Sequence, residues 1–291
     1  MNVDITLPDG SVRNYESPVT GFQIAESIGP RLLKDAICIE IDNKFQDLSF
    51  EISENINIRI VTTKDLDALH ILRHSSAHIL AQAVLNLYPN AQFGVGPSIE
   101  NGFYYDFLFE TPIKENELEN IEKEMKRIAK SAQSFIRSEI TKKDAEKIFK
   151  NQKLKLELIE SAESDEGVGE EIVSTYSNDE FIDLCMGPHV PSTSVLKHFK
   201  LTKISGAYWR GDETNVQLQR IYGTSWFSKE DLDQYLIQQE EAEKRDHRKL
   251  GNELDLFTSS EELGSGNFLW KPKGAVLRDV IETYSKKAHL Q

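Results

Sequence analysis

The stretch HILRHSSAHIL, residues 70–80, contains two histidines four positions apart, His74 and His78. Residues four apart lie one turn apart on the same face of a helix, so a helix here brings the imidazoles of His74 and His78 together. The apolar residues around them are typical of a helix that packs against a core. An isolated pair of this kind is as often two core histidines bonded to backbone carbonyls as a functional site.

A second pair lies far downstream, at Cys185 and His189 in the stretch CMGPH. Gly187 and Pro188 interrupt any helix, so we expect a bent loop that aims a thiol and an imidazole at one point. The chain has only 7 His and 2 Cys, and two such pairs together favour a functional site over a structural one. We therefore expect three imidazoles and a thiol to share one pocket.

The composition is that of an ordinary globular protein, with 291 residues, 39% hydrophobic and 28% charged, and it allows two or three domains. Two cysteines are too few for a disulfide framework, and the start MNVD lacks the basic and apolar segments of a signal peptide. We therefore expect a cytoplasmic protein. No apolar stretch is long enough to cross a bilayer, so we expect no membrane partner.

The formal net charge of -14 argues against nucleic-acid binding over the whole surface, because binding to phosphates needs clustered Lys and Arg. A local basic segment with interleaved aromatics nevertheless occurs within residues 190–222. This segment is either a solvent-exposed face or a surface that binds the phosphate backbone of a nucleic acid. The aromatics modestly favour the second interpretation, unless they belong to the core. Its basic residues are Lys197, Lys200, Lys203, Arg210 and Arg220, against Asp212 and Glu213.

The first sixty residues predict a compact β-rich unit. Residues 3–7 and 12–15 alternate in polarity around the turn PDGS, which indicates a hairpin. Thr20 is a candidate cap for a helix that runs to about residue 28. Residues 36–41 and 56–61 then predict further strands, giving the order ββαββ. No cluster here suggests catalysis, so we interpret the unit as a binding or docking module.

The next segment predicts a mixed α+β domain. A helix from about residue 65 carries both histidines to Tyr88, and Pro89 ends it. Glycines at 94, 96 and 102 allow something to approach the backbone, although an ordinary turn is a stronger interpretation than a phosphate loop. The remaining predicted elements are helices at 115–134 and 142–151, and strands at 103–107, 175–184, 204–210 and 215–222; the strand at 175–184 delivers Asp183 and Cys185 to the pocket.

A charged helix from Lys229 to about Gly251 is expected to connect domains. After it the pattern changes, and an apolar-periodic helix at 274–288 predicts the opening of a further domain. The fold class is therefore α+β and multidomain. The expected division is 1–62, 63–225, 226–250 and 251–291.

Several long strings now support a family resemblance. The chain resembles bacterial-type threonyl-tRNA synthetase nearly from end to end, and the two His/Cys pairs match the signature pairs of that family's editing domain. The other matching strings are LPDGS at 7–11, DLCMGPHVP at 183–191, GAYWRGD at 206–212, LQRIYGT at 218–224 and RDHRKLG at 245–251.

The resemblance implies a ubiquitin-like β-grasp TGS domain at 1–62, an editing domain at 63–225, a linker helix at 226–250 and the start of a class II catalytic domain at 251–291. The resemblance stops at Gln291, around the helix of class II motif 1. ATP, Mg²⁺ and the family's zinc site would then belong to an absent catalytic domain, so we expect no cofactor and no aminoacylation in this fragment. The parent dimer forms largely through that domain, so we expect a monomer.

The resemblance also implies an activity. In the family the catalytic domain charges tRNA with threonine, and the editing domain hydrolyses mischarged Ser-tRNA(Thr). Serine lacks only one methyl of threonine, and a missing contact discriminates by about 1–3 kcal/mol, so a second sieve is required. The implied partners are the acceptor end of tRNA(Thr) and the seryl ester of its terminal adenosine.

The candidate catalytic residues are His74, His78, Lys155, Asp183, Cys185 and His189. His74 is our candidate for positioning or deprotonating the attacking water. Lys155 matches the family's Lys-x-Glu-Leu stretch and would polarise the carbonyl or stabilise the oxyanion, although without the resemblance it is more simply a solvated lysine. Asp183 would hold an imidazole tautomer or the substrate ammonium. His78, Cys185 and His189 would complete the wall of the pocket.

Three alternatives stay open. Three imidazoles and a thiolate form a plausible tetrahedral zinc set, as in a zinc-dependent alanyl-type editing hydrolase, although we favour a metal-free site. The chain is otherwise a non-catalytic module that binds the tRNA acceptor arm. A free regulatory TGS protein is the least favoured interpretation.

Overall fold

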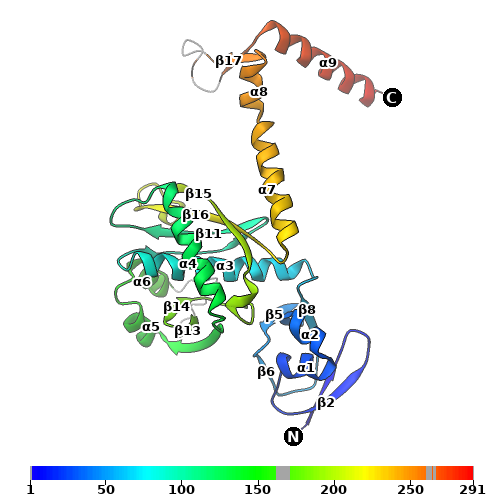
Figure 1. Ribbon diagram of the computed structural model, residues 1–291, viewed down its shortest axis with the longest axis vertical. Helices are drawn as coiled ribbons and strands as arrows, with labels where there is room; N and C mark the ends of the chain where they lie inside the picture. The colour runs from blue at the N-terminus through cyan, green and yellow to red at the C-terminus, as the bar shows by residue number, and fades with distance from the viewer. Residues whose placement is uncertain (1, 162–170, 260–263, 265–266, 291) are drawn as a thin grey trace. The chain divides into compact units, whose positions relative to one another are not determined.

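The computed structural model describes residues 2–161, 171–259, 264 and 267–290. Contacts divide the chain into two compact units, Met1–Leu232 and Asp233–Gln291. The first unit has two buried hydrophobic clusters, one between Val3 and Ile58 and a larger one between Ile37 and Ile221. We call residues 2–62 the N-terminal region and residues 63–226 the middle region. Sheets and helices occur in both, so the predicted α+β class is confirmed (Figure 1).

The N-terminal region begins with the predicted hairpin, formed by β1 (Asn2–Thr6) and β2 (Val12–Glu16). Gly10 has a φ of 82°, which its missing Cβ allows, and closes the turn. Val3 and Ile5 point into the core, as alternation requires. The short strand β7 (Ile56–Asn57) pairs with β1 in parallel.

The predicted helix is α1 (Gly21–Ile28), and Thr20 caps it. Thr20 and Gln23 form a reciprocal capping box, in which each side chain accepts a hydrogen bond from the other's backbone N–H. The predicted strand at 56–61 is divided between two sheets, because β7 pairs with β1 while β8 pairs with β4. The remaining elements are β3 (Val19–Thr20), α2 (Pro30–Asp35), β4 (Ala36–Ile41), β5 (Lys44–Asp47), β6 (Glu51–Ile52) and β8 (Arg59–Thr62), so the predicted ββαββ order was incomplete.

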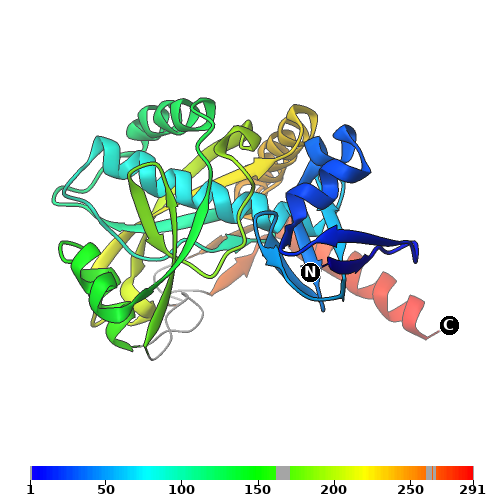
Figure 2. The same cartoon turned by 90° about the horizontal axis from the view of Figure 1, so that it is seen from below.

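The middle region is built on an antiparallel sheet in the order β10-β11-β16-β15, with β9 also paired to β11. Helix α3 (Asp67–Leu87) packs on β11 and β16, and α4 (Leu118–Lys130) packs on α3 and β15, so the two helices lie side by side on one face (Figures 1 and 2). The sheet strands are β9 (Gln92–Phe93), β10 (Ser98–Ile99), β11 (Gly102–Leu108), β15 (His198–Tyr208) and β16 (Gln217–Trp226).

A second antiparallel sheet consists of β12 (Ile136–Thr141), β13 (Ile172–Asn178) and β14 (Phe181–Leu184). The predicted single strand at 175–184 was wrong, because the chain reverses at Asp179, whose φ is 55°. Asp tolerates this left-handed conformation better than most residues. The aromatic and branched residues that predicted one strand belong to both arms of a hairpin, and Asp183 lies near the end of its second arm.

The predicted helix at 142–151 is shorter, α5 (Lys142–Ile148), and a helix that was not predicted follows it, α6 (Lys153–Ser161). Helix α6 turns Leu154, Lys155, Leu158 and Ile159 inward. The interpretation of Lys155 as a solvated lysine is therefore wrong. The described part of this region also includes the short 3-10 helices η1 (Glu115–Glu117), η3 (Thr193–Val195) and η4 (Trp209–Gly211).

Helix α7 (Lys229–Lys244) runs from the first unit into the second, and the predicted continuous helix to Gly251 is interrupted after it. The side chain of Asp246 accepts a hydrogen bond from the Arg248 N–H and caps a new helix, α8 (His247–Glu253). The second unit then contains a hairpin of β17 (Phe257–Ser259) and β18 (Phe268–Trp270), followed by α9 (Pro272–His289).

Among the residues that the structure describes, none of the helices combines the length and apolar character needed to span a bilayer. The expected four-part division of the chain stays a prediction. The contacts resolve two units, and the division between them falls inside α7.

Candidate functional site

The two predicted pairs meet at one place. Helix α3 carries His74 and His78 one turn apart, with ring centroids 5.0 Å from each other. The thiol of Cys185, just past the end of β14, lies 3.0 Å from His74 Nε2. His189 Nε2 lies 3.4 Å from the same sulfur. Three imidazoles and a thiol therefore share one cluster, as the sequence predicted, and we call these four residues the imidazole–thiol cluster.

His189 is the centre of the stacking. Its ring is parallel to that of His74, with centroids 4.6 Å apart, and parallel to Phe135 on the other side, also at 4.6 Å. His78 and Tyr176 meet its edges at 4.2 and 4.5 Å. Packing on all sides holds the ring in one orientation, since any rotation would collide with a neighbour.

Ser75 determines which nitrogen of His189 carries the proton. The Ser75 hydroxyl donates its one hydrogen to the Ile71 carbonyl at 2.8 Å and accepts from the Val190 N–H at 3.0 Å. His189 Nδ1, 3.0 Å from the same oxygen, must then be the donor. The lone pair of Nε2 is left facing Cys185.

A buried ion pair adjoins the imidazole–thiol cluster. Lys155 Nζ lies 2.5 Å from Asp183 Oδ1, and both side chains are almost completely buried. The Tyr105 hydroxyl donates to the other Asp183 oxygen at 2.5 Å and accepts from Lys155 at 3.1 Å. Asp183 Oδ2 lies 3.9 Å from His78 Nε2, which joins the pair to the cluster. All six predicted site residues therefore lie together.

A cavity of about 690 Å³ opens at this place. His74, His78, Tyr105, Asp183 and Cys185 line it, whereas Lys155 and His189 lie behind these residues. The charge of Lys155 therefore reaches the cavity across Tyr105 and Asp183. Strand β5 of the N-terminal region contributes Lys44, Phe45 and Gln46 to the rim.

The N-terminal region also contacts the cluster directly. Asp47, at the end of β5, accepts a hydrogen bond from the His189 backbone N–H at 2.9 Å and one from the Tyr176 hydroxyl at 2.5 Å. Burial raises the pKa of Asp47, while these two hydrogen bonds act to lower it. No sequence pattern indicates this role, because Asp47 is a single acidic residue in a segment without any catalytic pattern.

Two glycines let the backbone approach rings of the site closely. A Cβ on Gly96 would lie 2.1 Å from the Tyr105 ring, and one on Gly187 would lie 2.0 Å from the Tyr176 hydroxyl. Gly187 also has a φ of 76°, and its N–H points at the Cys185 sulfur at 3.2 Å. In the glycine-rich turn the group that approaches Gly96 is therefore Tyr105, and the group that approaches Gly94 is the Trp209 ring.

Burial keeps the three imidazoles neutral. It lowers the pKa of His74 to about 4, and the neighbouring His70 adds to this effect. It also lowers the pKa of His78 and of His189 well below the usual value of an imidazole, and in both cases the adjacent imidazoles contribute. Burial raises the pKa of the Asp183 carboxyl, against the opposing charge of Lys155. Neutral imidazoles accept hydrogen bonds and bind metals, so both chemistries are available here.

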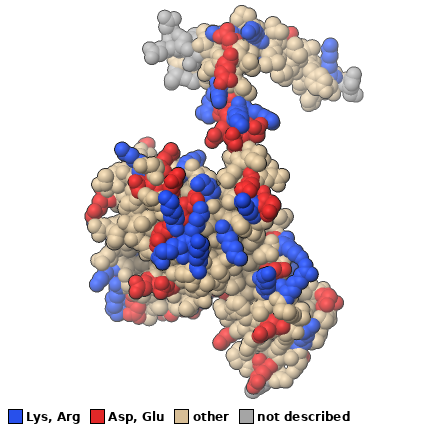
Figure 3. All heavy atoms as spheres, viewed as in Figure 1, with Lys and Arg blue, Asp and Glu red and all other residues tan. Residues whose placement is uncertain are grey.

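Much of the predicted basic segment makes contacts within the molecule. Arg220 forms a bidentate salt bridge with Asp106 at 2.7 and 2.8 Å and lies over the Tyr104 ring. Arg210 bonds to Ser161, and Phe199 and Trp209 are buried in the core. The more prominent gathering of basic side chains lies over α4, as Figure 3 shows, where the exposed residues are Lys123, Lys126, Arg127 and Lys130.

Comparisons with known proteins define the class first. Residues 173–222 match the model of the Threonyl and Alanyl tRNA synthetase second additional domain. This segment holds β14, the Cys185–His189 loop, β15 and most of β16. The middle region therefore contains the additional domain that these synthetases share.

The relatives are more specific. The chain is 52% identical over 288 residues to the threonine–tRNA ligase of Burkholderia multivorans, an alignment that covers 98% of this chain and 44% of that protein. It is 47% identical over 291 residues to that of Geobacter sp. strain M21, over 99% of this chain and 45% of that protein. The chain is thus a homologue of part of threonine–tRNA ligase, and it spans less than half the length of these relatives.

Proposed function

We propose that the middle region is an editing site that hydrolyses the ester of Ser-tRNA(Thr). The observation that carries the proposal is the imidazole–thiol cluster, which adjoins the Lys155–Asp183 pair and borders one open cavity. Its residues include part of the matched second additional domain. We further propose that residues 1–62 form the family's TGS domain, and that the ATP-dependent ligase chemistry belongs to parts of the relatives that this chain does not span.

In the proposed reaction water attacks the ester carbonyl. His74 is the most exposed of the three imidazoles and lines the cavity, so it is the group that meets the water. Because its pKa is about 4, it is a weak base at neutral pH, and we infer that it orients the water by accepting a hydrogen bond. Asp183 holds the substrate ammonium, and the buried Lys155 stabilises the negative charge that develops nearby.

A deacylation assay tests the proposal. Wild-type protein should release serine from Ser-tRNA(Thr) and leave Thr-tRNA(Thr) intact, because a sieve for serine must exclude one more methyl. His74→Ala should lower the rate by at least about a hundredfold, since the water loses its acceptor. Equal rates for His74→Ala and wild type would favour the alternative of a non-catalytic module that only binds the acceptor arm.

A zinc-dependent reaction is the second candidate, and one observation favours it. The ligand atoms of His74, His78, Cys185 and His189 all lie within 4.8 Å of one another. Tetrahedral zinc bonds of about 2.0–2.3 Å place ligands about 3.4–3.7 Å apart, so a small contraction would complete the set. His78 Nδ1 is buried without a hydrogen-bond partner among the described residues, which fits a metal ligand. If all four groups bound zinc, the site would be closed and structural; a hydrolytic zinc would be held by three of them, which would leave the fourth position for a water of lowered pKa.

Metal analysis decides between the two candidates. We expect protein purified without chelator to contain far less than one zinc per chain, and its deacylation rate to be unchanged by EDTA. Stoichiometric zinc, with loss of activity on chelation and recovery on adding zinc back, would establish the zinc reaction instead.

We propose that the tRNA backbone lies along α4. Two of its four exposed basic residues are paired, Lys126 with Glu122 and Arg127 with Glu124. Lys123 and Lys130 have no ion pair among the described residues, so they carry the local positive charge on a chain of net charge -14. Changing Lys123 and Lys130 together to Glu should weaken tRNA binding about tenfold or more at low salt and reduce the salt dependence of binding. The same double change on α9, at Lys286 and Lys287, is the matched control; equal weakening there would argue against a track on α4.

A further inference from the structure

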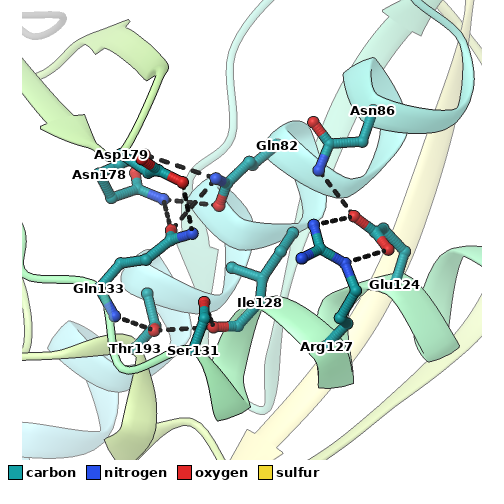
Figure 4. A network of polar contacts seen from close by, with 10 residues as sticks. All are labelled: Gln82, Asn86, Glu124, Arg127, Ile128, Ser131, Gln133, Asn178, Asp179 and Thr193. Carbon is teal, nitrogen blue, oxygen red and sulfur yellow. Dashed lines mark hydrogen bonds and ion pairs between the residues drawn. The ribbon is translucent and has the colours of Figure 1, made fainter.

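Three amide side chains meet near the imidazole–thiol cluster, and we call Gln82, Gln133 and Asn178 the amide cluster. Gln82 and Asn178 are buried and Gln133 is half-buried. Asn178 Nδ2 donates to Gln82 Oε1 at 2.7 Å and to Gln133 Oε1 at 3.1 Å. Gln82 Nε2 donates to the same Gln133 oxygen at 3.1 Å. Figure 4 shows the three amides pointing toward one another from three different segments. Each amide therefore contacts both of the others.

Each of these segments also carries part of the candidate site. Gln82 is one turn beyond His78 on α3, so His74, His78 and Gln82 follow one face of the helix. Asn178 ends β13, whose partner strand β14 carries Asp183. The amide cluster thus joins the helix of the histidines to the hairpin of the carboxylate.

Gln133 brings in the third segment. Its backbone N–H donates to Thr193 Oγ1 at 3.0 Å, and its carbonyl accepts from the Thr193 N–H at 2.8 Å. Thr193 follows His189 by four residues, and Phe135, two residues after Gln133, stacks on the His189 ring at 4.6 Å. The position of Gln133 is therefore coupled to that of His189 in two ways, through the hydrogen bonds to Thr193 and through the stacking of Phe135.

Apolar packing alone would fix the relative positions of these three segments less tightly. Apolar contacts have no preferred direction, whereas amide hydrogen bonds fix both distance and angle, and they are strongest in a buried setting. Gln82 is 5% and Asn178 0% exposed. Asn178 Oδ1 has no hydrogen-bond partner among the described residues, and such a buried acceptor costs stability. A cluster selected for stability alone would avoid that cost.

We propose that Gln82, Gln133 and Asn178 are positioning residues that set where His78, Asp183 and His189 stand relative to one another. Among the described residues no hydrogen bond joins their side chains to the candidate catalytic side chains, so they act through the three segments that they join. The kinetic test of this inference rests on the proposed deacylation, whereas the structural test, which follows the imidazole signals, does not depend on it.

The decisive variant is Gln82→Met, which keeps the length of the side chain and removes both amide contacts. The matched control is Gln219→Met on β16, because Gln219 makes two hydrogen bonds to the Ile113 backbone, at 2.8 and 2.9 Å, and contacts no site residue. Gln82→Met should lower kcat about tenfold with KM within about twofold, since small misplacements of catalytic groups are costly. Gln219→Met should leave kcat unchanged.

A second measurement separates positioning from loss of stability. The imidazole NMR signals of His78 and His189 should shift in Gln82→Met and stay in place in Gln219→Met, with both variants folded at the temperature used. Adding Asn178→Leu to Gln82→Met should cost little further activity, because residues that act as a unit are not additive. Unchanged kcat and unchanged imidazole signals in folded Gln82→Met would overturn the inference.

The two proposals fail differently. If wild-type protein releases no serine while the imidazole signals still shift in Gln82→Met, the proposed function is wrong and the positioning inference stands. If wild-type protein is active and Gln82→Met matches it in kcat and in its signals, the positioning inference alone is wrong.

Discussion

The two regions of the first unit differ in what they bury. In the N-terminal region every described buried side chain is apolar, whereas the middle region buries polar and charged groups from Arg73 to Ser225. A buried polar group costs free energy unless it is partnered, so a fold that serves only as a scaffold avoids it. Some of these groups in the middle region, including His78 and Asp183, line its cavity. The contrast indicates that it carries the chemistry, while the N-terminal region reaches the site mainly through Asp47.

The largest effect should come from unpairing the buried charge of the middle region. Asp183→Ala leaves Lys155 buried beside Phe93 and Tyr105 without its carboxylate, and should lower the free energy of unfolding by about 3–5 kcal/mol. Urea unfolding followed by circular dichroism measures the change. The double variant Lys155→Met, Asp183→Leu should recover most of the stability and none of the hydrolysis. A loss below about 1 kcal/mol in the single variant would show that water reaches the ammonium.

The pH dependence of stability should also distinguish the regions. His74 has a pKa of about 4 in the folded chain against about 6.5 when unfolded, so between these values the unfolded state binds more protons. The free energy of unfolding should therefore fall as the pH drops from about 6.5 to 4, by up to about 1.4 kcal/mol per pH unit for each such histidine. His78 and His189 act in the same direction. The raised pKa of Asp183 and of Asp47 acts in the opposite direction.

Urea unfolding at several pH values measures this dependence, with His74→Gln as the control that removes one titrating group. The deacylation rate should show no acidic limb near pH 6.5, because His74 is already neutral there. A limb near 6.5 that disappears in His74→Gln would contradict the described burial of this imidazole.

A smaller effect is expected where the two regions meet. Asp47→Ala removes the acceptor of the His189 N–H and of the Tyr176 hydroxyl, and should lower the free energy of unfolding by about 1–3 kcal/mol and also slow hydrolysis. Asp4→Ala is the matched control, because the side chain of this exposed aspartate on β1 accepts a hydrogen bond from Asn14 Nδ2 in the same region, while its bond to Asn55 is donated by the backbone N–H and is kept. If both variants keep full activity, the N-terminal region contributes nothing to the site beyond the rim of the cavity.

Local patterns predicted much of the fold, including the first hairpin, the Thr20 cap and the long helix of the histidines, since each depends on neighbours in the sequence. They missed the reversal at Asp179 and helix α6, where the residues alone fit more than one structure. The spacing of the two pairs also predicted that His74, His78, Cys185 and His189 lie together, whereas Lys155 was a candidate only through the family resemblance. Local patterns could not find Asp47 or the amide cluster, because single Asp, Asn and Gln residues gain meaning only from long-range contacts.

The smallest effect concerns the two cysteines, one in each region. Cys38 lies on β4 at 0% exposure, and burial raises its pKa to about 12, so its thiolate is scarce at neutral pH. Cys185 borders the cavity and contacts two imidazoles. Iodoacetamide should therefore modify Cys185 in the native protein and reach Cys38 only after unfolding. Cys38→Ala should lower the free energy of unfolding by about 1 kcal/mol and leave hydrolysis unchanged, because it removes only a small apolar contact. Native modification of Cys38 as fast as that of Cys185 would show that β4 readily separates from the larger hydrophobic cluster to which Cys38 belongs, and the contrast between a closed apolar region and an open polar one would then fail.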